Sequence, residues 1–396
     1  MSETKLESAV SVPSEFRYGE VSSLTSYKNT SSSGPSLGPL AAFTGTFSGR
    51  GFNTIFRPES AATPTALPLP VPPPPPPHDN ILELNLTSET LSFSKSLGSV
   101  PNRGMVQGDV FLNGVPYLQT ISDITIPSQP TGIHLEPGLW MIVPKTTDPA
   151  EGPTVVRMAS IPHGTTVMAQ GISSKISGKP TIPPVDITPF RTAAPNTKIL
   201  FASQTAATDN APRIPQNLGP FVAAGTITQA MLTDPNTLLR NHLASQNITS
   251  TTTIFVSTSP AAPLFGGGAD NIAFLLGDAA ALTNPAPAGP NAQTLKMNAT
   301  FWIETVEHVI EVPIFKPGQP PLTIYAETGD AGQPVAKFLV NPPIEIAAPR
   351  KITVQSTQIQ YSQEVFLNFN GLTWPHVSVA TLVPSEPLPV PPSAWT

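Results

Sequence analysis

The sequence predicts an all-β protein built around an antiparallel barrel, and three observations support this fold class. Proline supplies 50 of the 396 residues; it interrupts helices but is tolerated at strand ends and in turns. Short runs with an apolar residue at every second position recur along the chain. From Phe43 to Gly171 such runs follow one another without a helical pattern. A long antiparallel meander favours a closed barrel, because closure removes unpaired edges; a sandwich is the main alternative.

The composition excludes several functional classes. Only 12% of the residues are charged, the net charge is −6, and no Lys/Arg cluster occurs, which argues against nucleic-acid binding. The absence of cysteine excludes disulfides, thiolate zinc sites and cysteine nucleophiles. We see no secretory signal and no long apolar run, so we expect a cytoplasmic protein that does not engage a membrane.

The chain divides into regions of different composition. The expected strands are too many for one simple barrel, so either two barrels share the chain or one barrel carries extra strands outside. We favour two β units that pack together, with few short helices. The regions are a flexible N-terminal arm (1–40), a first β-barrel region (41–175), a Pro/Thr-rich linker (176–217), a second β region with the closing strands (218–384) and a Pro-rich tail (385–396).

Within the first region the pattern predicts a series of hairpins. We expect a strand kinked at Gly49–Gly51, a hairpin turning at Ser88–Glu89, and a second turn at the Asn113–Gly114 dipeptide, a strong hairpin signal. Residues 67–79 predict a polyproline II segment, either a stiff surface loop or a docking site for a partner. Three further strands are expected at 139–143, 154–159 and 165–169.

The second region combines strands with one helix. Residues 230–245 show leucines at helical spacing, with Asp234–Pro235 at the expected helix start. The remaining runs predict strands at 218–228, 251–258, 271–276, 295–313, 322–325, 335–340, 352–354, 358–368 and 373–383.

Four segments together suggest a family. Gly45–Gly51 (GTFSGRG) resembles the GTWxGxG opening strand of the nitrobindin family, and His134–Trp140 (HLEPGLW) resembles its HxExGxW strand. Ala159–Gly164, with Gly171 seven residues further on, is similar to the hairpin that follows in that family. Pro375–Leu382 resembles its closing PHxxATL strand, with one extra residue before Ala380. The resemblance covers about half of the chain, at its two ends, and implies a calycin-like barrel related to fatty-acid-binding proteins.

This resemblance implies a haem site. The histidine of the closing strand, here His376, corresponds to the proximal iron ligand of haem b. His376 follows Trp374–Pro375 in an apolar strand, so ligand and pocket wall would come from one segment; the alternative is a core histidine bonded to backbone. His134 and His163 are candidate distal groups on the same cavity; because each adjoins a turn, the alternative is a solvated histidine. Trp140 is a further candidate for contact with the cofactor.

Two charged residues near these histidines also invite interpretation. His134 and Glu136 are two residues apart and share a strand face, so they are expected to orient each other. Arg157 lies within an apolar run, and we favour an outward orientation over a buried ion pair.

Three functions remain open from the sequence. The first is a β-barrel protein that binds ferric haem and reacts with small ligands such as nitric oxide, peroxynitrite or peroxide; the resemblance implies a peroxynitrite isomerase or peroxidase-like activity if there is one. The second is a haem-free carrier of an apolar small molecule. The third is a structural or assembly protein. Edge strands and the aromatic content are compatible with a homodimer.

Overall fold

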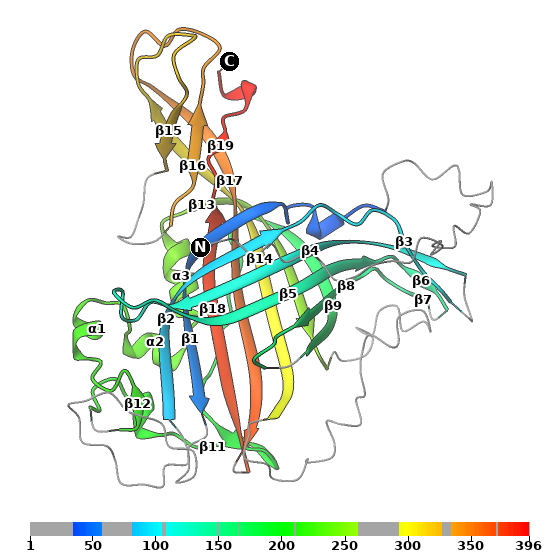
Figure 1. The fold of residues 1–396 in the computed structure, drawn as a ribbon, viewed down its shortest axis with the longest axis vertical. Helices are drawn as coiled ribbons and strands as arrows, with labels where there is room; N and C mark the ends of the chain where they lie inside the picture. The colour runs from blue at the N-terminus through cyan, green and yellow to red at the C-terminus, as the bar shows by residue number, and fades with distance from the viewer. Residues whose placement is uncertain are drawn as a thin grey trace, which may run out of the picture.

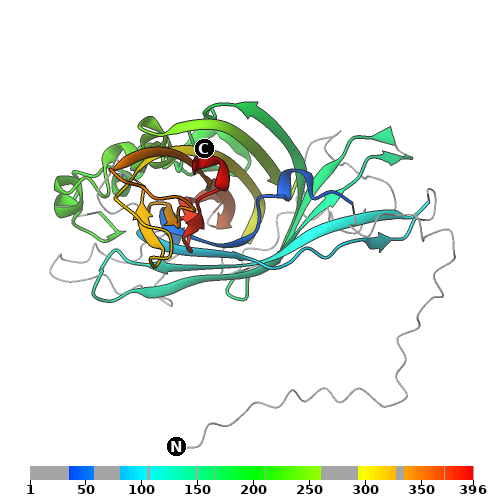
Figure 2. The same ribbon diagram turned by 90° about the horizontal axis from the view of Figure 1, so that it is seen from above.

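The fold is a closed, ten-stranded antiparallel barrel. The computed structural model describes residues 35–57, 81–104, 108–148, 150–164, 166–209, 211–259, 293–326, 334–369 and 371–395. The segments 67–79 and 271–276 and most of the expected N-terminal arm lie outside these residues. The ring runs, in pairing order, through β1 (Gly45–Arg57), β2 (Ile81–Phe93), β4 (Val110–Asp123), β5 (Thr131–Val143), β8 (Thr154–Ser160), β9 (Thr166–Ser177), β13 (Asn247–Ser257), β14 (Gln293–Val312), β17 (Arg350–Phe369) and β18 (Leu372–Pro384) (Figures 1 and 2).

Two pairings show that one barrel uses both regions of the chain. β9 pairs with β13, which joins the first region to the second, and β18 pairs with β1, which closes the ring. The expectation of two packed β units is therefore wrong. The alternative, one barrel with extra strands outside it, is what the chain forms, because the four strands of the second region complete the ring begun by six strands of the first.

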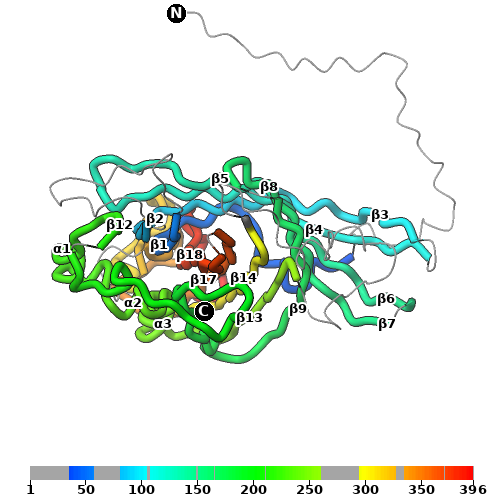
Figure 3. The backbone as a smooth tube through the Cα atoms, turned by 90° about the horizontal axis from the view of Figure 1, so that it is seen from below, coloured from blue at the N-terminus to red at the C-terminus, as the bar shows by residue number. Residues whose placement is uncertain are grey.

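The extra elements lie around this ring. The short strands are β3 (Val100–Asn102), β6 (Thr146–Thr147), β7 (Ala150–Glu151), β10 (Phe190–Arg191), β11 (Ala194–Lys198), β12 (Arg213–Ile214), β15 (Leu322–Tyr325), β16 (Lys337–Val340) and β19 (Leu388–Pro389). The helices are α1 (Gly219–Ala223), α2 (Gln229–Thr233) and α3 (Thr237–Ala244), with 3-10 turns at Gly38–Leu40, Ala202–Gln204 and Pro392–Trp395. Figure 3 shows the three helices gathered on one side of the barrel.

Several local expectations fail because strands are longer than turn residues suggest. β2 runs straight through Ser88–Glu89, and β4 runs through Asn113–Gly114. A side chain at position 114 would meet the Trp140 carbonyl oxygen at 2.4 Å, so this glycine permits close approach of β5 instead of forming a turn. The expected strand at 218–228 contains α1, and the helix expected at 230–245 is split into α2 and α3 at Asp234–Pro235.

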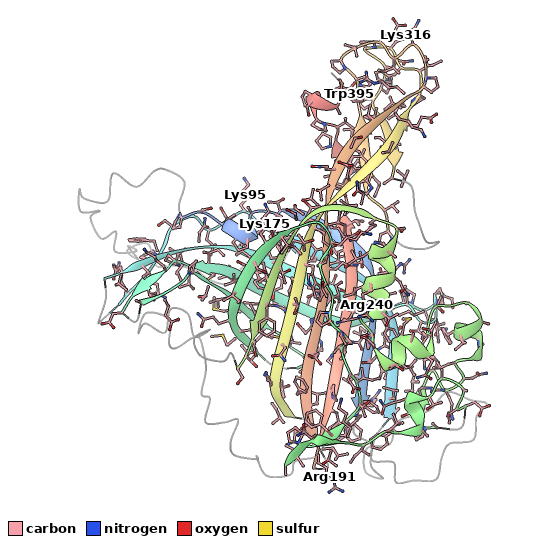
Figure 4. All side chains as sticks on the ribbon, turned by 180° about the vertical axis from the view of Figure 1, so that it is seen from behind. Lys95, Lys175, Arg191, Arg240, Lys316 and Trp395 are labelled. Atoms are coloured by element: carbon pink, nitrogen blue, oxygen red, sulfur yellow. The ribbon has the colours of Figure 1, made fainter. Side chains whose placement is uncertain are left out.

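Three apolar clusters account for the stability of this arrangement. Residues from all ten ring strands fill the barrel interior, among them Phe47, Trp140 and Phe301. A second cluster packs α2, α3 and the segment before them against the outer face of β1, β2, β14 and β18. A third cluster lies in a projection of the sheet, formed where β14 and β17 extend beyond the ring. β15, β16 and Trp395 pack on this projection (Figures 1 and 4). The barrel is thus plugged by its own side chains over most of its length.

Candidate functional site

A cavity of about 260 Å³ is lined by residues near the end of β1 and the start of β18. These strand ends lie at the end of the barrel opposite the extensions of β14 and β17 (Figure 1). Its walls come from strands at the two ends of the chain, because closure of the ring places β1 and β2 beside β17 and β18. The lining residues are Asn53, Ile55, Arg57, Glu83, Asn85, Gln119, Ile121, Ile133, His134, His163, Tyr361, Gln363, His376 and Ser378. The three histidines singled out in the sequence therefore meet at one site.

His376 presents one ring nitrogen to this cavity. Its Nδ1 lies 3.1 Å from the backbone carbonyl oxygen of Thr54 on the neighbouring strand β1. A carbonyl oxygen can only accept, so Nδ1 carries the proton and donates it. Burial lowers the pKa of His376 to about 4, so at neutral pH the ring is uncharged and Nε2 keeps its lone pair. A neutral imidazole whose second nitrogen donates to a backbone carbonyl is the usual arrangement of a metal-binding histidine.

His134 is held in a different way. Its Nε2 lies 3.1 Å from Glu136 Oε2, which confirms the expected pair on one face of β5. Glu136 Oε1 accepts a hydrogen bond from Arg157 Nη2 at 2.6 Å and another from the Tyr117 hydroxyl. Burial alone would raise the pKa of Glu136, but the Arg157 guanidinium and the bonds from His134 and Tyr117 lower it to about 2. Glu136 is therefore a buried anion at neutral pH.

Arg157 lies inside the barrel, which corrects the expectation that it points outward. It is 1% exposed, donates to Tyr117 and Gln363 as well as to Glu136, and lies over the rings of Tyr117, Trp140 and Phe301. Val155 and Ala159, on the same face of β8 as Arg157, lie in the barrel interior, whereas Val156 on the other face packs in a separate apolar cluster. Both faces of β8 are thus buried, and the charge of Arg157 is compensated by a partner that is itself buried.

A second buried carboxylate lies beneath the cavity. Glu89 accepts hydrogen bonds from the Tyr361 hydroxyl at 2.6 Å, from Thr87 at 2.8 Å and from Gln119 at 3.3 Å. Burial raises the pKa of Glu89, with those three hydrogen bonds opposing the rise. Tyr361 and Gln119 also line the cavity, so Glu89 orients two groups of its floor.

The wall formed by β1, β2 and β18 is polar and connected. Asn53 donates to the Ser378 hydroxyl at 2.7 Å, and Asn85 donates to the side chains of Asn53 and Glu83 at 3.3 Å. Arg57 forms an ion pair with Glu83 at 3.1 Å at the edge of the cavity, where its side chain is 45% exposed. The cavity thus has an ion pair at its rim, in which the charge of Arg57 is balanced by Glu83.

His163 and the two tryptophans have different surroundings. The His163 ring lies edge-on to that of His134, 5.0 Å between centroids, on the exposed turn between β8 and β9. Trp140 lies in the apolar plug of the barrel, and Trp374 packs between Phe56, Phe201 and Phe369. Neither tryptophan lines the cavity, so the expected pocket wall from Trp374 is not present there; both side chains are used to fill core space.

The residues fit a haem in their donor chemistry and limit how it can be enclosed. Within the described residues no three His, Asp or Glu side chains lie close enough to hold a metal ion. One free imidazole nitrogen suits haem, whose porphyrin supplies the other ligands in the ring plane. The cavity, about 260 Å³, is smaller than the roughly 300–1,000 Å³ of pockets for drug-sized ligands, so a haem held by His376 would extend beyond it.

The polar residues of β2 that face the cavity were not predicted from the sequence. Glu83 and Asn85 alternate with Leu82, Leu84 and Leu86, a pattern typical of a strand with one apolar and one polar face. In the structure Leu82 and Leu84 pack under the helices outside the barrel, and Glu83 and Asn85 line the cavity. A strand buried on both faces usually shows a nearly continuous apolar run, so the alternation gives no sign that the polar face of β2 lies inside the barrel.

Comparison of the chain with family models, with curated proteins and with solved structures found no match. In the described part of the chain, no helix has the length and apolar character required to span a membrane.

Proposed function

We propose that this protein binds ferric haem at the open end of its barrel, with His376 Nε2 as the protein ligand. The observation that carries the proposal is the hydrogen bond from His376 Nδ1 to the Thr54 carbonyl, which fixes the ring and leaves Nε2 as the free nitrogen. Among the other lining histidines, His134 is held by a carboxylate oxygen, Glu136 Oε2, at 3.1 Å and not by a backbone carbonyl. The resemblance of Pro375–Leu382 to the closing strand of nitrobindins, noted from the sequence, selects the same residue independently.

A bound ferric haem supplies an iron centre able to take nitric oxide, peroxynitrite or peroxide as small ligands, which is the chemistry that the resemblance implies. This chain would contribute the ligand His376, the Arg57–Glu83 ion pair at the rim, and polar groups on the remaining walls. Gln363 Oε1 accepts from Arg157 Nη1 at 2.7 Å, which leaves the Gln363 amide hydrogens as the donors it has for other partners.

The cavity wall is chemically mixed. Ile55, Ile121 and Ile133 are the aliphatic residues among the lining, whereas most of the others carry amides, hydroxyls, charges or imidazoles. Many of these polar groups already have partners within the wall, among them Asn53, Tyr361 and Gln363, so the haem-free carrier of an apolar molecule stays the second candidate function.

A haemin titration tests the proposal. The wild-type protein should give a saturable Soret band at one haemin per chain, and His376→Ala should lose it or weaken binding strongly. The matched control is His308→Ala, because His308 lies away from the cavity and is held by Ser356 at 2.8 Å. A flat titration, or equal bands in wild type and His376→Ala, would contradict the proposal.

A further inference from the structure

Tyr361, in the floor of the cavity, has a single hydroxyl hydrogen, and Glu89 binds it. The Tyr361 hydroxyl donates to Glu89 Oε2 at 2.6 Å and accepts from Gln119 Nε2 at 3.2 Å. A hydroxyl oxygen carries one hydrogen and two lone pairs. While Glu89 is ionised, the hydrogen and one lone pair are therefore used within the wall. The second lone pair is what Tyr361 can then offer to a ligand.

A protonated Glu89 would reverse the roles of these groups. Its acidic hydrogen needs an acceptor, and the Tyr361 oxygen lies within hydrogen-bond distance of Oε2. Tyr361 would then accept from both Glu89 and Gln119, so both of its lone pairs would be occupied. Its own hydrogen would be released from Glu89 and could turn to the cavity, which Tyr361 lines. Tyr361 would thus meet a ligand as a donor.

Thr87 is the other oxygen that a protonated Glu89 could reach. Its hydroxyl donates to Glu89 Oε1 at 2.8 Å, and Thr87 is 1% exposed. If Thr87 accepted the hydrogen of Glu89, its own hydroxyl hydrogen would lose the acceptor that the described residues give it, which is costly in a buried site. The Tyr361 hydrogen has the cavity to turn to, so this exchange favours Tyr361 as the acceptor.

The charges around Glu89 differ from those around the other buried carboxylate of the barrel. Glu136 is paired with Arg157, whereas no ion pair among the described residues includes Glu89. The charged or titratable groups that face Glu89 and Tyr361 from neighbouring strands are His134 on β5 and Arg157 on β8. Burial raises the pKa of Glu89, and a charge on His134 would oppose the rise. Glu89 is therefore the carboxyl of the barrel interior that can gain a proton without breaking an ion pair.

We infer that Glu89 is a positioning residue that sets the hydrogen-bonding role of Tyr361 in the cavity. Ionised Glu89 makes Tyr361 an acceptor, which suits a ligand group that carries a hydrogen, such as a hydroxyl or an amine. Protonated Glu89 makes Tyr361 a donor, which suits an anionic oxygen. The inference concerns the cavity floor and goes beyond haem binding, because it applies to any occupant that reaches Tyr361.

Infrared spectroscopy of the haem-free protein with carbon-13-labelled tyrosine tests this exchange, because the C–O stretch of a tyrosine depends on whether its hydroxyl donates or accepts. The signal that is absent from Tyr361→Phe should shift as the pH falls. The shift should coincide with a protonated-carboxyl C=O band that is absent from Glu89→Gln, and Glu89→Gln should show no Tyr361 shift. Tyr117 is the internal control: its partner Glu136 has a pKa of about 2, so its signal should stay constant.

Two further variants separate the exchange from its neighbours. Thr87→Val and His134→Ala should both keep the Tyr361 shift. A shift seen in Thr87→Val but not in the wild type would assign the hydrogen of Glu89 to Thr87 and overturn the inference. A shift that persists in Glu89→Gln but is lost in His134→Ala would overturn it by assigning the titration to His134.

The wild type alone also decides the question, without a variant at Glu89. A Tyr361 signal that stays constant over the whole pH range in which the wild type is folded would overturn the inference. A flat haemin titration would contradict the proposed function and leave this test unaffected, since it is made without haem.

Discussion

At the scale of single residues, the barrel interior is organised by charges that are compensated inside it. The Glu136–Arg157 pair lies between the apolar plug and the cavity and connects the two. Such a pair adds little net stability against an apolar alternative, but losing one partner is costly. The pair is therefore best understood as part of the cavity, since it fixes both His134 and Gln363.

Arg157→Met should lower the free energy of unfolding by about 3–5 kcal/mol, because Glu136 then remains buried without its counter-ion. Urea unfolding at neutral pH measures this loss. The double variant Glu136→Leu/Arg157→Met is the matched control. It should recover most of the lost free energy of unfolding, since it leaves no buried charge without a counter-ion. A double variant as unstable as the single one would show that the loss comes from packing.

The same pair predicts an acid dependence of stability. The pKa of Glu136 is lowered to about 2 in the folded protein, below about 4.3 in the unfolded chain. Its contribution is present above pH 4.3 and is lost as the pH falls toward 2. In the double variant this part of the acid dependence should disappear, which unfolding measured as a function of pH will show.

Glu304, on the outer face of the barrel, should give the opposite pH dependence of stability. It is 1% exposed, one of its oxygens accepts from Gln358 at 2.7 Å, and the other has no hydrogen-bond partner among the described residues. Burial raises the pKa of Glu304 to about 8, so the folded protein keeps it protonated where the unfolded chain ionises. The contribution of Glu304 to the free energy of unfolding is thus fully present below about pH 4.3 and is lost as the pH rises through 8.

Glu304→Gln should therefore stabilise the protein by about 2–4 kcal/mol at pH 8 relative to its effect at pH 5. Thermal unfolding of both proteins at the two pH values is the measurement. A Glu304→Gln variant with the same shift at both values would show that Glu304 does not change its charge on unfolding.

At the scale of elements, the closure of the barrel depends on close approach between β1 and β18. A side chain at Gly49 would place its Cβ 1.9 Å from the Thr381 carbonyl oxygen, and one at Gly51 would lie 2.3 Å from that of Val379. The glycines that predicted a kink in the sequence instead let two backbones meet.

Gly49→Ala should destabilise the protein by about 1–3 kcal/mol, the usual cost of overpacking. Gly152→Ala is the matched control, because a Cβ there would meet nothing within 4 Å. Chemical unfolding compares the two variants, and equal stability of both would contradict the close approach.

The elements also show what the sequence could predict. Strands with clear alternation and turn residues at both ends were found at the expected places: β5, β8 and β9 pair in order, and β15 spans Leu322–Tyr325 as expected. Local turn signals failed at Asn113–Gly114, because cross-strand packing against Trp140 needs a glycine there. Helix boundaries failed at Asp234, whose carboxylate accepts from the backbone of Val185 and Asn236 and so ends α2.

The candidate site was predictable only where short segments of the sequence carried the signal. His376, His134 and His163 were selected from four short segments, and the structure brings all three to one cavity. Glu89 and Tyr361 were not selected, because they lie 272 residues apart in the sequence, and Arg157 was singled out but expected to point outward. Only the ring closure places such groups together.

At the scale of the whole molecule, the barrel is one folding unit. Residues 41–175 would end at β1 and β9, whose partners β18 and β13 come from the second region. This fragment should therefore lack a cooperative unfolding transition, whereas the full chain should show one for the barrel. Scanning calorimetry of the fragment and of the full chain measures these transitions. A fragment with its own sharp unfolding transition would show that residues 41–175 fold as a separate unit. The expected homodimer stays a prediction.

The central claim, that His376 Nε2 is the haem ligand, is tested most directly by replacing the ligand from solution. Haem-loaded His376→Gly should lose the wild-type Soret band, and added imidazole should restore it by occupying the space of the missing ring. If His376→Gly keeps the wild-type band without imidazole, or if imidazole has no effect on a folded variant, another group holds the haem and the claim is contradicted.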